Sequence, residues 1–167
     1  MKRSDFPLIL IGMHDYVEGA TRLQKYGFLL AMRHKELKKL GFYDDWEASD
    51  FGPFSKQLAS DLDTNVKNGL IGRYKLKNRY DFDVERFSVL GEGKNIVDDF
   101  GNLHPSEYDK MLKLTSSYQN KTLSQLLQDV YYLYPNYAVA SKIRAEIGRR
   151  IYESDSYLSK EYDESKE

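Results

Sequence analysis

Four cationic side chains recur at every second position of one short segment, and this is the pattern in the sequence best suited to binding chemistry. They are Arg73, Lys75, Lys77 and Arg79. Alternate residues of a β-strand share a face, so the first three would form one row and Arg79 would sit at a hairpin tip. Such a row could neutralise nucleic-acid phosphates. It also suits the solvated side of an edge strand, where lysine discourages aggregation.

A second candidate surface is the polar side of the helix expected between Gly52-Pro53 and Asn68-Gly69. The side chains on it that could reach base edges are Lys56, Ser60, Thr64 and Lys67. Asp61 and Asp63 on the same helix would meet phosphates unfavourably. A scaffold or a protein-binding face is therefore the alternative interpretation of this helix.

A third basic group lies near the end of the chain, on the last expected helix, and consists of Lys142, Arg144, Arg149 and Arg150. These residues could contact a DNA backbone or flank a dimer interface. A plain charged helix face explains them as well, because charged residues cover most exposed helix surfaces.

The sequence contains few residues in patterns typical of a catalytic or metal-binding site. The chain has no cysteine, which excludes thiol nucleophiles, disulfides and zinc-thiolate sites, and its three histidines lie far apart. The acidic run Asp44, Asp45, Glu47 and Asp50 lacks the glycine and the ligand spacing of an EF-hand. The segment 91–94, Gly-Glu-Gly-Lys, lacks the upstream glycine and the following Ser or Thr of a phosphate-binding loop. We expect no catalytic residue, metal or cofactor, and a protein that is not an enzyme.

The segment from Phe51 to Ile71 must position the first two of these surfaces, the cationic row and the polar side of the expected helix. Pro53 suits the first turn of a helix, and Gly69 suits a left-handed cap at its end. Between them an apolar residue recurs every fourth position, at Phe54, Leu58, Leu62 and Val66. This spacing predicts an amphipathic helix that leads through Asn68-Gly69 into a strand.

The remaining elements follow from hydrophobic periodicity and from glycine and proline breaks. Helices are expected over Phe6–Val17 and Ala20–Leu40, the second of them central because it is apolar on most sides. An extended segment over Phe42–Phe51, strands over Leu70–Lys77 and Val84–Leu90, a helix over Lys94–Phe100 closed by Gly101, and helices over 106–118, 122–134 and 137–152 complete the chain. Thr122 and Gln125 have the spacing of a capping box.

Three segments resemble a known family. They are Thr21-Arg22-Leu23-Gln24-Lys25, Phe51-Gly52-Pro53-Phe54-Ser55 and Asn68-Gly69-Leu70-Ile71. They resemble the YwgA-like proteins, which are similar to the phage-associated, SocA-type antitoxin family. The resemblance covers about Leu23 to Leu90 and also touches Tyr134-Pro135-Asn136-Tyr137. It implies a winged-helix fold and a regulatory role, and it carries no catalytic residues.

Composition agrees with one globular domain: 167 residues, 41% hydrophobic and 31% charged, with a net charge of −1. We predict an α+β, mostly helical protein with a winged helix-turn-helix-like domain over 1–101, a C-terminal helical extension over 102–152 and a disordered tail over 153–167. Without a membrane span or signal peptide, a cytoplasmic location is expected.

The leading functional hypothesis is a homodimeric, DNA-binding transcriptional regulator that contacts phosphates through its basic wing. Dimerisation is expected because the C-terminal helices are richer in Tyr and Leu than a small winged domain needs. The alternative is an antitoxin-like adaptor that uses the same fold to bind a protein partner without DNA. The near-neutral charge favours the adaptor.

Overall fold

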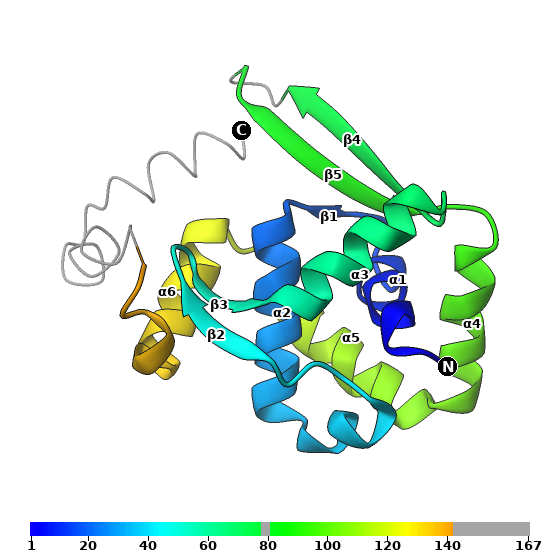
Figure 1. Ribbon diagram of the computed structural model, residues 1–167, viewed down its shortest axis with the longest axis horizontal. Helices are drawn as coiled ribbons and strands as arrows, with labels where there is room; N and C mark the ends of the chain where they lie inside the picture. Colours follow the sequence, from blue (N-terminus) through cyan, green and yellow to red (C-terminus); the bar gives the residue numbers. More distant parts are fainter. Residues whose placement is uncertain (78–80, 142–167) are drawn as a thin grey trace.

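A buried helix, α2 (Ala20–Arg33), runs through the middle of the protein, and the other elements pack around it (Figure 1). The computed structural model describes residues 1–77 and 81–141. Leu23, Phe28 and Leu30 of α2 are at most 1% exposed. The expected central position of this helix is therefore confirmed. The single helix predicted to Leu40 instead breaks at His34 and continues as the 3-10 helix η2 (Lys35–Leu40).

The protein is α+β and mostly helical, with two small antiparallel sheets. Its other elements in chain order are η1 (Arg3–Asp5), α1 (Phe6–Gly12), β1 (Val17–Glu18), β2 (Trp46–Ser49), β3 (Gly52–Ser55), α3 (Lys56–Lys67), β4 (Ile71–Lys77), β5 (Asp83–Val89), α4 (Gly93–Leu103), α5 (Pro105–Gln119), α6 (Leu123–Leu133) and η3 (Pro135–Tyr137).

The first sheet has the strand order β1-β5-β4. Strands β4 and β5 form the predicted hairpin, and β1 pairs with the edge of β5 that faces away from β4. The prediction of one helix from Phe6 to Val17 is wrong. Helix α1 ends at Gly12, and Val17 pairs with Phe87 of β5, which is fully buried. A β-branched residue gains more from this cross-strand packing than from a further turn of helix.

The second sheet is the hairpin β2-β3, and it corrects the predicted start of the following helix. Pro53 is not in a first helical turn but in β3, where it pairs with Ala48. Helix α3 begins at Lys56, and Ser55 caps it by accepting a hydrogen bond from the Leu58 amide at 3.0 Å. The predicted end is confirmed, since Gly69 follows the helix with a φ of 71°.

For the helices after the hairpin, the predicted N-terminal cap of α6 is confirmed, but two predicted helix ends are wrong. Thr122 and Gln125 form the predicted reciprocal capping box of α6. Helix α4 continues through Gly101 to Leu103 and so is not closed by that glycine. The predicted helix over 137–152 is absent over residues 137–141, which form the end of η3 and a turn, and residues 142–167 lie outside the described part. That outside part includes the predicted tail over 153–167.

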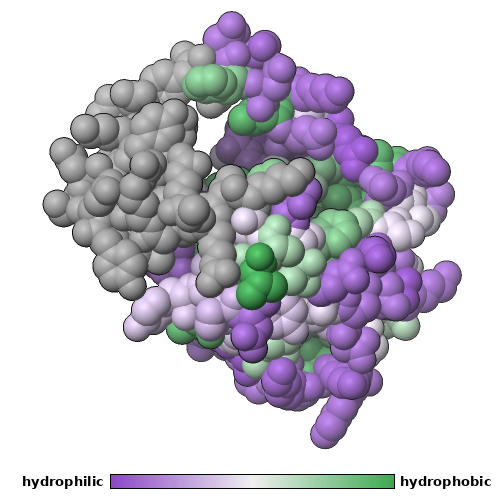
Figure 2. Space-filling model, turned by 60° about the vertical axis from the view of Figure 1, so that its left-hand side comes forward, coloured by the Kyte–Doolittle hydropathy of each residue, from purple (hydrophilic) through white to green (hydrophobic). Residues whose placement is uncertain are grey.

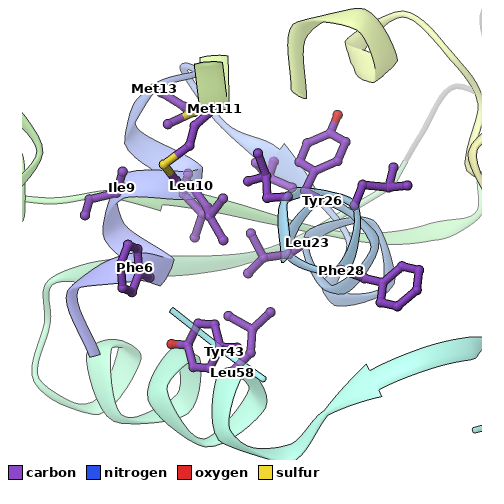
Figure 3. Close-up of a cluster of buried hydrophobic side chains, with 14 of the residues drawn as sticks. Phe6, Ile9, Leu10, Met13, Leu23, Tyr26, Phe28, Tyr43, Leu58 and Met111 are labelled. Carbon is purple, nitrogen blue, oxygen red and sulfur yellow. The ribbon is translucent and has the colours of Figure 1, made fainter. Parts of the chain in front are cut away.

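One continuous hydrophobic cluster joins the N-terminal elements to the C-terminal helices (Figure 3). Phe6 of α1 contacts Phe42 and Phe100 edge to face, with ring centroids 4.7 and 6.2 Å apart. Met111 of α5 reaches the same cluster (Figure 3). The apolar side chains of α6 that underlie the expectation of a dimer are buried in it too: Leu126, Leu127, Val130 and Tyr131. Part of that apolar surplus is therefore used inside the chain, whereas Leu123, Tyr132 and Leu133 of α6 are exposed.

None of the helices within residues 1–77 and 81–141 combines the length and the hydropathy that crossing a bilayer requires.

Candidate functional site

Two adjacent polar residues of α2 anchor strand β3 from inside the core. The Gln24 side chain donates to the Ser55 carbonyl at 3.0 Å and accepts from the Ser55 amide at 2.9 Å. The Lys25 ammonium donates to the Pro53 carbonyl at 2.9 Å. Gln24 and Lys25 are at most 4% exposed, and their side chains give partners to the buried Ser55 amide and Pro53 carbonyl. The segments 21–25 and 51–55 are thus bound to each other.

Burial sets the protonation of Lys25. Removal of the ammonium from water lowers the pKa of Lys25 to about 7, because its hydrogen-bond partner Pro53 is a neutral carbonyl that does not replace the lost hydration. Lys25 also lines a pocket of about 250 Å³ between α2, α3 and β3. Phe54, Leu58 and Leu62 supply much of the apolar wall of that pocket.

Two carboxylates of the acidic run before β3, those of Asp45 and Glu47, contact the start of α3. Asp45 accepts hydrogen bonds from the Ser55 hydroxyl and from the Gln57 amide, so its carboxylate caps the start of α3. Asp44 pairs with Lys38, and Glu47 pairs with Lys56. In the part of the chain that the structure describes, no three His, Cys, Asp or Glu side chains converge as metal ligands would.

Asp61 belongs to the inner side of α3, so the expectation that it would meet phosphates unfavourably on the polar side of this helix is wrong. It is 7% exposed and receives two hydrogen bonds from Arg3, at 2.8 and 3.1 Å, and one from the Tyr43 hydroxyl at 2.8 Å. Burial and the neighbouring Asp61 carboxylate raise the pKa of Tyr43. This network ties the N-terminus and the segment after η2 to α3.

The four residues of α3 proposed from the sequence to contact bases are all exposed, as predicted: Lys56, Ser60, Thr64 and Lys67. Two of them already have partners. Lys56 pairs with Glu47 at 3.1 Å, and the Thr64 hydroxyl donates to the Ser60 carbonyl at 2.9 Å. The face also carries Asp63, which is exposed and negative. This surface is polar but not strongly basic.

The basic row of the hairpin forms on β4, and most of its charge is matched by carboxylates. Arg73 lies 2.7 Å from Asp63 of α3 and 3.7 Å from Glu85 of β5. Lys77 lies 3.0 Å from Asp83. Lys75 stands opposite Glu85 in the register but, among the described residues, has no ion-pair partner. Arg79 and the third basic group (Lys142, Arg144, Arg149 and Arg150) lie outside the described residues.

A groove of about 1060 Å³ beside β1 was not foreseen from the sequence. It lies between β1, the start of α2, β5 and the connection from α5 to α6. At its edge His14 shares a hydrogen bond with the Thr115 hydroxyl at 2.8 Å, and burial lowers the pKa of this histidine. The groove forms from residues far apart in the chain, so no local pattern could reveal it.

Figure 2 shows one face on which hydrophobic residues occur in small groups among hydrophilic ones.

Comparisons of the chain with protein-family models, with curated proteins and with solved structures gave no match. The functional interpretation therefore depends on the geometry of the residues described above.

Proposed function

We propose that this chain is a protein-binding module built on a winged-helix framework. The order α1-β1-α2-α3-β4-β5, with the sheet order β1-β5-β4, supports that framework. In a winged helix the hairpin is the wing and α3 corresponds to the recognition helix. Here the hairpin β2-β3 is inserted between α2 and α3, and the bonds from Gln24 and Lys25 hold it in place.

The observation that carries the proposal is the pairing of the cations on the surface that would face DNA. Arg73, Lys77 and Lys56 each have a carboxylate oxygen within about 3 Å. A phosphate backbone would have to approach those carboxylates as closely as the cations. DNA-binding affinity depends largely on unpaired cations that replace condensed counterions. A surface on which three of the cations are already paired suits a protein partner better, because it supplies specificity without a strong attraction to polyanions.

DNA binding is the competing function, and the winged-helix order of the elements favours it. Exposed ion pairs contribute only about 0–1 kcal/mol each, so phosphates could compete for Arg73 and Lys77. The two functions therefore need a direct measurement.

The experiment is fluorescence anisotropy of labelled duplex DNA titrated with the purified chain across a salt series. We expect no saturable binding even at roughly 50 mM salt, where phosphate contacts are strongest. Binding that fades steeply with salt and disappears when Lys75, Lys77 and Arg79 become Ala would establish the DNA-binding function instead. The protein-binding function further requires a partner that copurifies with the tagged chain and binds it again when both are purified.

A further inference from the structure

Among the described residues strand β4 is an edge of its sheet, and its outer side carries a row of backbone groups that pair with no other strand. The sheet order places β4 beside β5 alone, and Figure 1 shows the hairpin standing out from the helices. Leu90 donates to the Leu70 carbonyl, and the pairing alternates, so Gly72, Tyr74 and Leu76 also exchange bonds with β5. The N–H and C=O groups of the intervening residues, Arg73, Lys75 and Lys77, therefore point away from β5.

The opposite strand confirms this alternation independently. Glu85, the partner of Lys75 in the register, accepts a hydrogen bond from Gly19, which lies on the side away from β4. Lys75 and Glu85 are thus a pair without mutual hydrogen bonds, and the backbone of Lys75 faces outward.

The two faces of β4 differ in chemistry. Arg73, Lys75 and Lys77 project from one face, and Tyr74 and Leu76 project from the other with 43% and 37% of their surfaces exposed. On the neighbouring strand β5, Asp83 and Glu85 project from the cationic face, and Val84 projects from the same face as Leu76. Among the described residues Lys75 is the member of this row without an ion-pair partner, and the pairs of Arg73 with Asp63 and of Lys77 with Asp83 are exposed, so an acidic strand could compete for them.

We propose that an extended segment of a partner protein, alternating acidic and apolar residues, adds to the outer edge of β4 as a further strand. Its backbone pairs with Arg73, Lys75 and Lys77, its acidic side chains face that cationic row, and its apolar side chains pack on Tyr74 and Leu76. A second copy of the chain is the wrong occupant, because pairing β4 with itself places cations opposite cations. The proposal rests on the protein-binding function and names the chemistry of its partner.

The probe is a fluorescein-labelled, seven-residue peptide of alternating glutamate and valine, matched to the seven residues of β4. We expect saturable binding by anisotropy. The same peptide N-methylated on alternate backbone amides should bind at least ten-fold more weakly, and so should an alternating lysine and valine peptide. Failure of the glutamate peptide to bind, or equal binding of the N-methylated form, would overturn the proposal.

Variants of Lys75 separate backbone pairing from charge. Lys75→Ala keeps the outward N–H and removes the charge, whereas Lys75→Pro also removes the N–H without touching the bonds to β5. We expect Lys75→Pro to bind about five-fold more weakly than Lys75→Ala, as the loss of one hydrogen bond predicts. Equal affinity of the two variants would contradict strand addition. The N-methylated peptide gives the same answer with the unaltered protein, should Lys75→Pro fold poorly.

The outcomes distinguish this proposal from the protein-binding function itself. If duplex DNA binds with a steep salt dependence while the peptide does not, both are overturned. A purified protein partner could instead bind the chain with the same affinity for Lys75→Ala and Lys75→Pro. That result would support the protein-binding function and overturn strand addition at β4.

Discussion

Gln24 and Ser55 are joined by two hydrogen bonds between the side chain of one and the backbone of the other, across 31 positions of the sequence. A primary amide can accept from the N–H and donate to the C=O of one and the same residue, as a hydrogen-bonded partner on a neighbouring antiparallel β-strand would. Gln24 therefore acts as a one-residue substitute for a strand at the inner edge of β3. Because Ser55 also caps α3, the same pair sets where that helix begins.

Replacement of Gln24 by Ala should lower the free energy of unfolding by about 2–4 kcal/mol. It leaves the buried N–H of Ser55 without a partner, at a cost of about 1–3 kcal/mol, and it removes the Gln24 bond to the Ser55 carbonyl, worth about 1 kcal/mol, although that carbonyl still accepts the first hydrogen bond of α3. Urea denaturation followed by circular dichroism measures the change. Gln119→Ala, at an exposed position on α5, is the matched control and should change stability by under about 0.5 kcal/mol. Similar losses in both variants would mean that the Gln24 bonds contribute little.

The stability of the protein should rise with pH above 7 because of Lys25. Its pKa falls from 10.5 to about 7 on folding, so between these values the unfolded chain binds more protons and deprotonation favours the folded state. We expect a gain of about 2 kcal/mol between pH 7 and pH 9, below the range in which tyrosines titrate. Denaturation curves at fixed salt across this range, compared with Lys25→Met, provide the test. The dependence should flatten in the variant, and a wild-type curve that is already flat would contradict the prediction.

Substitution of Gly52 by Ala should destabilise the protein more than the same change at Gly19. Both glycines have a φ near 85°, which costs about 1–3 kcal/mol for a residue with a side chain. A Cβ at Gly52 would also lie 2.6 Å from the ring of Tyr131, whereas a Cβ at Gly19 meets nothing within 4 Å. The excess, about 1–3 kcal/mol, measures the close packing of β3 on α6. Equal thermal shifts for the two variants would show that the ring moves aside at no cost.

Asp61 and Asp63 lie two positions apart on α3 and should respond very differently to replacement by Ala. Asp61→Ala removes the shared acceptor of Arg3 and Tyr43 from a buried position, with an expected loss of about 2–4 kcal/mol. Asp63→Ala breaks one exposed ion pair with Arg73 and should cost under about 1 kcal/mol. Chemical denaturation of the two variants checks the difference. A large loss for Asp63 would indicate that the hairpin depends on its salt bridge.

The sequence predicts local features of this fold well. The Thr122 and Gln125 cap, the left-handed Gly69 and the two strands of the hairpin all depend on residues within a few positions of each other. The errors concern contacts between distant residues. Pro53 fits a helix start by its local chemistry, but pairing with β2 decides its conformation. Val17 continues a helical pattern until β5 supplies a partner.

The candidate surfaces were predictable to a similar extent. The row of Arg73, Lys75 and Lys77 follows from alternation alone, and the structure places these residues on one face. Their partners do not follow, because Asp63 reaches Arg73 only once α3 packs beside the hairpin. Lys25 looks like an ordinary helix lysine in the sequence, and nothing local indicates that its ammonium is buried against Pro53.

The pairing of Val17 with Phe87 has a consequence for the order in which the protein can assemble. During synthesis the first helices leave the ribosome long before β5 does. Until residues 83–89 emerge, the short strand β1 has nothing to pair with, and the apolar side of α1 that packs on β5 stays open to water. Slow translation between α3 and β5 should therefore lengthen the time during which the nascent chain can be captured by chaperones or can aggregate.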